Sequence, residues 1–114
     1  MSASELDRLR KAIDELDRVI VKLLNQRAKY AIEVGHAKRA AELPVYSPDR
    51  EREVLRGVES ENRGPLSADG IRRLYERIID ESRRLERQAR GQDERQARDA
   101  KGTAETENEK GGSE

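Results

Sequence analysis

Two cations interrupt an apolar stripe in the first third of this 114-residue chain. Residues spaced alternately three and four apart share one face of a helix, and here that face is apolar except at Arg27. The stripe reads Leu6, Leu9, Ile13, Leu16, Ile20, Leu23, Arg27, Tyr30, Val34 and Ala37. Lys38 follows Arg27 by about three helical turns, so both cations lie on nearly the same face. Because an unpaired buried cation is costly, either internal carboxylates meet these two or they line a cavity for an anionic small molecule.

Polar residues also fall on the apolar faces of two later segments. Glu51 lies three residues before Val54, so it points inward, and Ser82 and Glu86 share a face four residues apart. With flanking Arg10 and Arg50, the candidate set is Arg10, Arg27, Lys38, Arg50, Glu51, Ser82 and Glu86. This set contains no nucleophile paired with a base, which favours binding and polarising a dianion over covalent chemistry.

Three helices are expected to position these side chains. A long helix begins near Ser4, which with Asp7 resembles a capping box, and ends before Pro44. A short helix begins at Ser47-Pro48 and closes near 62–65, and a medium helix begins after Ser67. The first helix would be about 55 Å long, roughly twice the diameter of a domain of this size. We therefore expect an all-α fold in which two chains intertwine as a homodimer.

Composition excludes several other classes of protein. The chain has 24 basic and 24 acidic residues, no Cys, one His and no Trp or Phe. These counts argue against a nucleic-acid partner, a disulfide framework and a metal site. No apolar run is long enough to span a membrane, so we expect a soluble, cytoplasmic protein without cofactor. Residues 1–90 are expected to form the domain, and residues 91–114 a charged, disordered tail.

Several motifs in this order resemble one known family. Its first helix is matched by 23–27 (Leu-Leu-Asn-Gln-Arg) and 33–38 (Glu-Val-Gly-His-Ala-Lys), its second by 48–53 (Pro-Asp-Arg-Glu-Arg-Glu), and its last by 78–82 (Ile-Ile-Asp-Glu-Ser) with Glu86. The chain thus resembles the all-helical, AroQ-type chorismate mutases over about residues 6–90. Members of that family rearrange chorismate to prephenate, in the shikimate pathway to aromatic amino acids, as intertwined homodimers with two active sites.

The resemblance implies a role for each candidate residue. Arg27, and Arg10 donated by the other subunit, would hold the two substrate carboxylates, and Lys38 would bind the ether oxygen. Glu51, with help near Ser47, would meet the ring hydroxyl. The remaining site residues would be Arg50, which supports that end, Ser82 at the ring carboxylate, and Glu86, where many members have Gln. Lys38, Glu86 and Arg27 are the expected catalytic residues. No second catalytic domain follows, so a freestanding enzyme is expected.

Two other functions fit the same residues. Isochorismate pyruvate-lyase and 4-amino-4-deoxychorismate mutase activities occur on similar scaffolds, although Glu51 after Arg50 suits a ring hydroxyl and favours chorismate. A non-catalytic helical dimerisation module is the alternative from another class. That module would keep its function when Arg27 or Lys38 is replaced by alanine, since removing a buried charge can even stabilise a protein.

Overall fold

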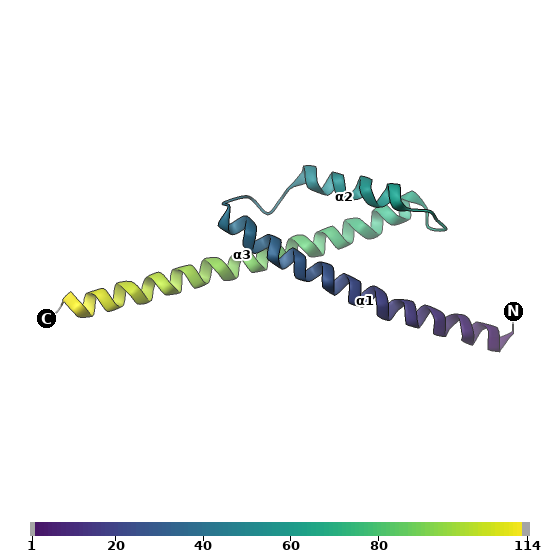
Figure 1. Ribbon diagram of the computed structural model, residues 1–114, viewed down its shortest axis with the longest axis horizontal. Helices are drawn as coiled ribbons and strands as arrows, with labels where there is room; N and C mark the ends of the chain where they lie inside the picture. Colours follow the sequence, from purple (N-terminus) through teal and green to yellow (C-terminus); the bar gives the residue numbers. More distant parts are fainter. Residues whose placement is uncertain (1, 113–114) are drawn as a thin grey trace. The chain divides into compact units, whose positions relative to one another are not determined.

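Three helices make up the computed structural model, which describes the backbone of residues 2–112 and the side chains of residues 2–102. They are α1 (Ala3–Ala40), α2 (Pro48–Glu61) and α3 (Ala68–Gly112) (Figure 1). Within residues 2–112 there is no strand, so the expected all-α order of three helices is confirmed. In the same range no helix is sufficiently long and apolar to cross a membrane.

The helices begin where short polar side chains or proline favour a start. The Ser2 hydroxyl accepts a hydrogen bond from the Glu5 backbone N–H at 3.2 Å, so the capping serine of α1 is Ser2 and not Ser4. At α3 the Ser67 hydroxyl accepts from the Gly70 N–H at 2.9 Å, as expected. Ser47 precedes Pro48 at the start of α2, but its side chain makes no capping hydrogen bond.

A Schellman motif ends α1 just before Pro44. The Leu43 N–H donates to the Lys38 carbonyl at 2.8 Å, and the Glu42 N–H donates to the Arg39 carbonyl at 3.2 Å. Glu42 has φ 57°, the left-handed conformation that this motif requires and that usually falls to glycine. The chain is thereby turned sharply out of the helix within two residues.

The third helix is longer than expected. It continues to Gly112, so the backbone of residues 91–112 is helical where a tail without structure was expected. The loss of apolar periodicity after residue 90 removes a buried face, but Arg, Glu, Gln and Ala are all strong helix formers. Ion pairs one turn apart, such as Arg90 with Glu94 at 3.2 Å, add to this local preference. The division into a domain of residues 1–90 and a tail of residues 91–114 stays a prediction.

The chain divides into two compact units, Met1–Tyr30 and Ala31–Glu114. In the second unit α2 lies beside α3 (Figure 1), and an ion pair between Arg72 and Glu59 at 3.2 Å joins them. The buried apolar side chains of this unit are few and mostly small: Ala31, Val45, Leu55, Ile79 and Ala89. The core of this unit is therefore narrow, as expected from a chain without Phe or Trp.

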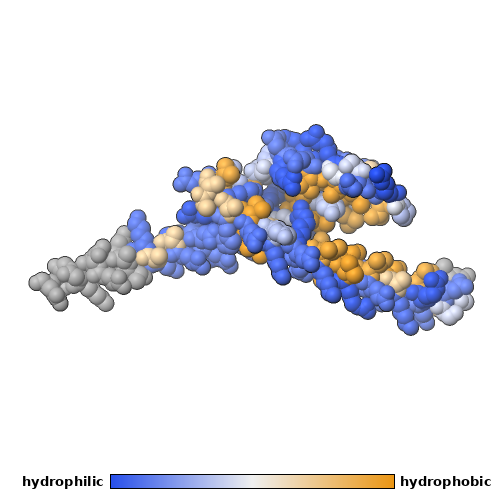
Figure 2. Space-filling view, viewed as in Figure 1, coloured by the Kyte–Doolittle hydropathy of each residue, from blue (hydrophilic) through white to orange (hydrophobic). Residues whose placement is uncertain are grey.

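The first unit is a stretch of α1 whose apolar side chains are exposed. Leu16 is 61% exposed and Leu23 is 57% exposed, and a band of hydrophobic surface follows this part of α1 in Figure 2. The exposed apolar side chains of this stretch are Leu6, Ile13, Leu16, Val19, Ile20, Val21, Leu23, Leu24 and Tyr30. Apolar surface of this extent is unfavourable in water, so a partner that covers it would stabilise this unit.

Candidate active site

A close crossing of two helices positions the candidate site. In the second unit the end of α1 meets α3 at Gly35, where a Cβ atom would lie 2.6 Å from the Glu86 carbonyl oxygen and 2.8 Å from the Glu86 Cα. The same Cβ would lie 3.1 Å from the Ala89 Cβ. Only glycine at residue 35 and a small residue at 89 allow the backbones to approach so closely. The crossing brings Lys38, one turn after Gly35, beside the Glu86 side chain.

Lys38 and Glu86 form a largely buried ion pair. The Lys38 Nζ lies 2.6 Å from the Glu86 Oε1, and the two side chains are 18% and 10% exposed. Nζ also donates a hydrogen bond to the Val45 carbonyl at 2.7 Å. Glu86 Oε1 is buried and has no aligned hydrogen-bond donor, so the close approach to Nζ is a contact between charges at a poor angle. A carboxylate of the chain thus meets Lys38, and because Glu86 is itself a candidate site residue, this pair fits both hypotheses for the stripe.

The loop of residues 41–47 closes over this ion pair. Its Val45 side chain is buried and its Val45 carbonyl accepts from Lys38. An Arg90 guanidinium nitrogen on α3 donates to the Leu43 carbonyl. Two cationic side chains therefore hold the loop by its backbone oxygens, which limits the positions that the Lys38 ammonium can take.

Glu51, in the first turn of α2, contacts a residue that the sequence analysis missed. The Arg83 Nε lies 3.1 Å from the Glu51 Oε1, and a second nitrogen of that guanidinium donates to the Asp80 carboxylate. A sequence signal was present: Arg83 lies four residues after the buried Ile79 and three before Glu86, on the same helical stripe. The signal is weaker than at Arg27, because Ile79 is the only apolar residue three or four positions from Arg83.

Three other candidates on the second unit take more local positions. Ser47 is half-buried and its carbonyl accepts the Glu51 N–H at 3.1 Å, so it fixes the first turn of α2. Ser82 is half-buried on α3, one turn before Glu86, and its hydroxyl donates to the Ile78 carbonyl at 2.9 Å. Arg50 is exposed and pairs with Glu53 on the surface of α2.

Arg10 and Arg27 belong to the first unit, on α1. Arg10 is exposed, whereas Arg27 is half-buried in spite of its place among exposed apolar side chains. The second unit therefore brings together Lys38 and Glu86 by direct contact, while these two arginines are held by the first unit. A carboxylate–cation pair and a hydroxyl at one helix crossing can bind and polarise an anion, but the hydroxyl donates to the Ile78 carbonyl and is not paired with a base that would activate it as a nucleophile.

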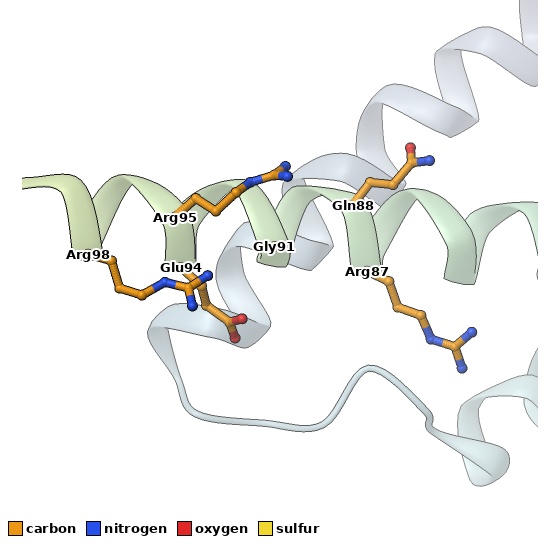
Figure 3. A pocket seen from close by; sticks show the side chains of 6 residues that line it. All are labelled: Arg87, Gln88, Gly91, Glu94, Arg95 and Arg98. Carbon is orange, nitrogen blue, oxygen red and sulfur yellow. The ribbon is translucent and has the colours of Figure 1, made fainter.

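One hollow on the second unit lies apart from these residues. It runs along α3 and is lined by Arg87, Gln88, Gly91, Glu94, Arg95 and Arg98 (Figure 3). None of these six is a candidate site residue, and all six come from one helix, so the hollow is a surface groove between neighbouring turns. Among the residues whose side chains are described, no group of three His, Cys, Asp or Glu residues could hold a metal ion.

Several known proteins are similar to this chain in sequence. The family model for chorismate mutase type II matches residues 9–87. A bifunctional chorismate mutase/prephenate dehydratase of Neisseria gonorrhoeae is 40% identical over 78 residues, which cover 68% of this chain and 21% of that protein. The protein of the same description from Aquifex aeolicus is 38% identical over 87 residues, 73% of this chain and 24% of that protein. This chain thus spans about a quarter or less of the length of these relatives.

Solved structures match over most of their own length. The chorismate mutase (form II) of Thermus thermophilus is similar with a TM-score of 0.71 and 36% identity, covering 73% of this chain and 94% of that one. The chorismate mutase of Helicobacter pylori in complex with prephenate is similar with a TM-score of 0.69 and 30% identity, covering 75% of this chain and 93% of that one. The sequence match and the helical fold agree, and the chain belongs to the chorismate mutase type II family.

Proposed function

We propose that this chain catalyses the rearrangement of chorismate to prephenate, a step toward aromatic amino acids, as a homodimer without cofactor. The observation that carries the proposal is the partly buried Lys38 ammonium, held by Glu86 and the Val45 carbonyl inside a family domain. The similar protein from Helicobacter pylori binds prephenate, the product of this reaction. The catalytic domain of the proposal is residues 1–90, which contain the family match to residues 9–87.

The chemistry of this rearrangement fits such a site. The substrate breaks its own ether C–O bond while a C–C bond forms elsewhere in the same molecule, so no atom enters or leaves. What a protein must supply is a compact conformer of a flexible dianion and stabilisation of the negative charge that develops on the ether oxygen. Fixed cations in a site that excludes water supply both.

Lys38 is the residue proposed to face the ether oxygen. The Schellman turn after it, the Val45 carbonyl and Glu86 hold the ammonium in place before substrate arrives. A group that needs no rearrangement stabilises the transition state at little additional cost. Glu86 is proposed to orient Lys38 and, as a protonated carboxyl, to donate a hydrogen bond to the same oxygen, because an ionised carboxylate could only accept one. Ser82 is proposed to contact the ring carboxylate, one turn away.

Arg27 and Arg10 are proposed to bind the two carboxylates, with Arg10 coming from the partner subunit. The exposed apolar stripe of the first unit supports a second copy of this chain as its partner. A helix of 38 residues is about 57 Å long, too long for one short chain to cover. Glu51, with Ser47 and Arg50 in the same turn, is proposed to bind the ring hydroxyl.

The test is the loss of chorismate absorbance on addition of purified protein, with prephenate and pyruvate measured separately. Wild type is expected to form prephenate, and Lys38→Ala to lower kcat/KM by roughly a hundredfold or more, because one donor to a developing charge is worth about 3–4 kcal/mol. Lys101→Ala is the matched control, since Lys101 is exposed and lies beyond the family match. Equal rates for the two variants, or no turnover by wild type, would refute the assignment.

A further inference from the structure

Arg83 joins three structural elements close to the proposed site. Its Nε lies 3.1 Å from the Glu51 Oε1 on α2, and its guanidinium carbon lies 5.5 Å from the centre of the Tyr46 ring in the preceding loop. A terminal nitrogen donates to Asp80 on its own helix. Because the guanidinium is planar, its contacts with Glu51, Asp80 and the Tyr46 ring together fix its orientation.

The contact with Glu51 is partly shielded from water. The Arg83 and Glu51 side chains are 26% and 21% exposed, and the Nε atom itself is buried. The Arg83 Nε makes no aligned hydrogen bond, so its contact with the Glu51 carboxylate at 3.1 Å is an electrostatic ion pair. Such contacts commonly tighten when a site fills with substrate, and partial burial strengthens them over surface pairs.

Glu51 needs a partner of this kind if it binds a hydroxyl beside a dianion. A carboxylate has two oxygens, and Arg83 engages Oε1. Fixing Oε1 also limits the directions in which the other oxygen, Oε2, can point. The guanidinium charge offsets the repulsion between Glu51 and a doubly negative substrate. A methionine at residue 83 would fill similar space without supplying either effect.

We propose that Arg83 is a positioning residue for substrate binding: it orients Glu51 and compensates its charge, so that this carboxylate accepts the hydrogen bond of the ring hydroxyl. The proposal rests on the proposed function, because it takes Glu51 as the residue that binds that hydroxyl. Arg83 itself contacts Glu51, Asp80 and Tyr46, and it acts on the substrate through Glu51.

The alternative is that Arg83 only ties α2 to α3, and the chain contains a matched control for that role. The Arg72 guanidinium lies 3.2 Å from Glu59, so this pair also joins α3 to α2, but it lies between the far end of α2 and the start of α3. A purely structural tie predicts the same kinetic effects for Arg83→Met and Arg72→Met. The positioning role predicts an effect on KM for Arg83→Met alone.

The experiment measures kcat and KM for chorismate in a double-mutant cycle of Arg83→Met and Glu51→Gln, with Arg72→Met as control. Arg83→Met is expected to raise KM roughly tenfold and change kcat less, while Arg72→Met leaves both within about twofold. In the Glu51→Gln background, Arg83→Met is expected to change KM by less than about twofold, because the charge pair is already gone. Circular dichroism and thermal melting establish that each variant is folded.

Each result decides between the roles. Equal KM effects of Arg83→Met in the wild-type and Glu51→Gln backgrounds, or equal effects of Arg83→Met and Arg72→Met, would overturn the positioning role. If Arg83→Met does not fold, Arg83→Lys replaces it in the cycle, with an expected rise in KM of about threefold that disappears in the Glu51→Gln background. Wild type without turnover would refute the proposed function itself. If wild type is active but the KM effects of Arg83→Met and Glu51→Gln are additive, only the role of Arg83 is overturned.

Discussion

The two compact units of the chain differ in what surrounds their apolar side chains. In the second unit Ile79 is 7% exposed, and Ala89, at the helix crossing that holds Lys38 and Glu86, is 2% exposed. In the first unit the apolar side chains of α1 are exposed along most of their stripe, as with Leu16 at 61%. One unit is packed by its own chain, and the other presents the surface that would be buried against a partner.

The charged residues of the two units differ in the same way. Lys38 and Glu86 neutralise each other within the second unit at 2.6 Å, and the loop of residues 41–47 fixes their geometry. Arg10 and Arg27 lie on the unit whose apolar surface is open. In the proposed enzyme, one chain thus prepares the contact with the ether oxygen, while assembly of two chains completes the carboxylate contacts.

Mixing two inactive variants gives the largest effect that tests this comparison. In the proposed dimer one site takes Lys38 from one chain and Arg10 from the other. A homodimer of either Arg10→Ala or Lys38→Ala therefore has no complete site and is expected to lose activity by roughly a hundredfold or more. A mixed dimer would contain one site with both wild-type residues. Random reassociation is expected to restore about a quarter of wild-type activity, because about half of the dimers are mixed and each has one intact site.

The measurement is the rate of chorismate loss after the two variants are unfolded and refolded together, with dimer formation checked by sedimentation equilibrium. Each variant refolded alone is the control. Activity that stays at the level of the separate variants would mean that Arg10 serves its own chain, and a monomeric wild type would break the comparison altogether.

Much of the helical layout could be predicted because local chemistry determines it. Pro44, Pro48 and Ser67 mark a helix end and two helix starts, and all three do so in the structure. The end of α3 was missed because apolar periodicity was taken as the sign of a helix. Its loss after residue 90 shows only that no face is buried, and residues 91–112 can still be helical because many of them are strong helix formers.

The candidate site divides along a similar line. Lys38 and Glu86 stood out because each interrupts an apolar face, and the structure pairs them. Arg83 was missed because only one of the residues three and four positions from it is apolar, so it does not interrupt an apolar stripe. The contact of Gly35 with Glu86 depends on where two distant segments cross, and no spacing within one helix contains that information.

Replacing the glycine at this helix crossing gives the next largest expected effect, a loss of stability. Gly35→Ala puts a Cβ 2.6 Å from a backbone oxygen that cannot rotate away, so α1 and α3 must separate. We expect the free energy of unfolding to fall by about 1–3 kcal/mol. The rate of chorismate conversion should fall as well, because Lys38 moves away from Glu86.

The control is Gly57→Ala on α2, where a Cβ would meet nothing within 4 Å. There the loss of backbone freedom in the unfolded chain is expected to stabilise the protein by about 0.5–1 kcal/mol. Urea unfolding at one fixed protein concentration compares the two variants, since the stability of a dimer depends on concentration. Equal effects of the same sign would show that the crossing is not as tight as 2.6 Å.

The smallest expected effect comes from the turn that ends α1. Glu42 has φ 57°, which costs a side-chain-bearing residue about 1 kcal/mol, so Glu42→Gly is expected to stabilise the protein by about 0.5–1 kcal/mol. Glu33→Gly, at an exposed position inside α1, makes the same chemical change in right-handed helix and is expected to destabilise by about 1 kcal/mol. Opposite signs in urea unfolding would place the strain at Glu42, in the loop of residues 41–47. Destabilisation by both variants would mean that Glu42 leaves the left-handed conformation in solution.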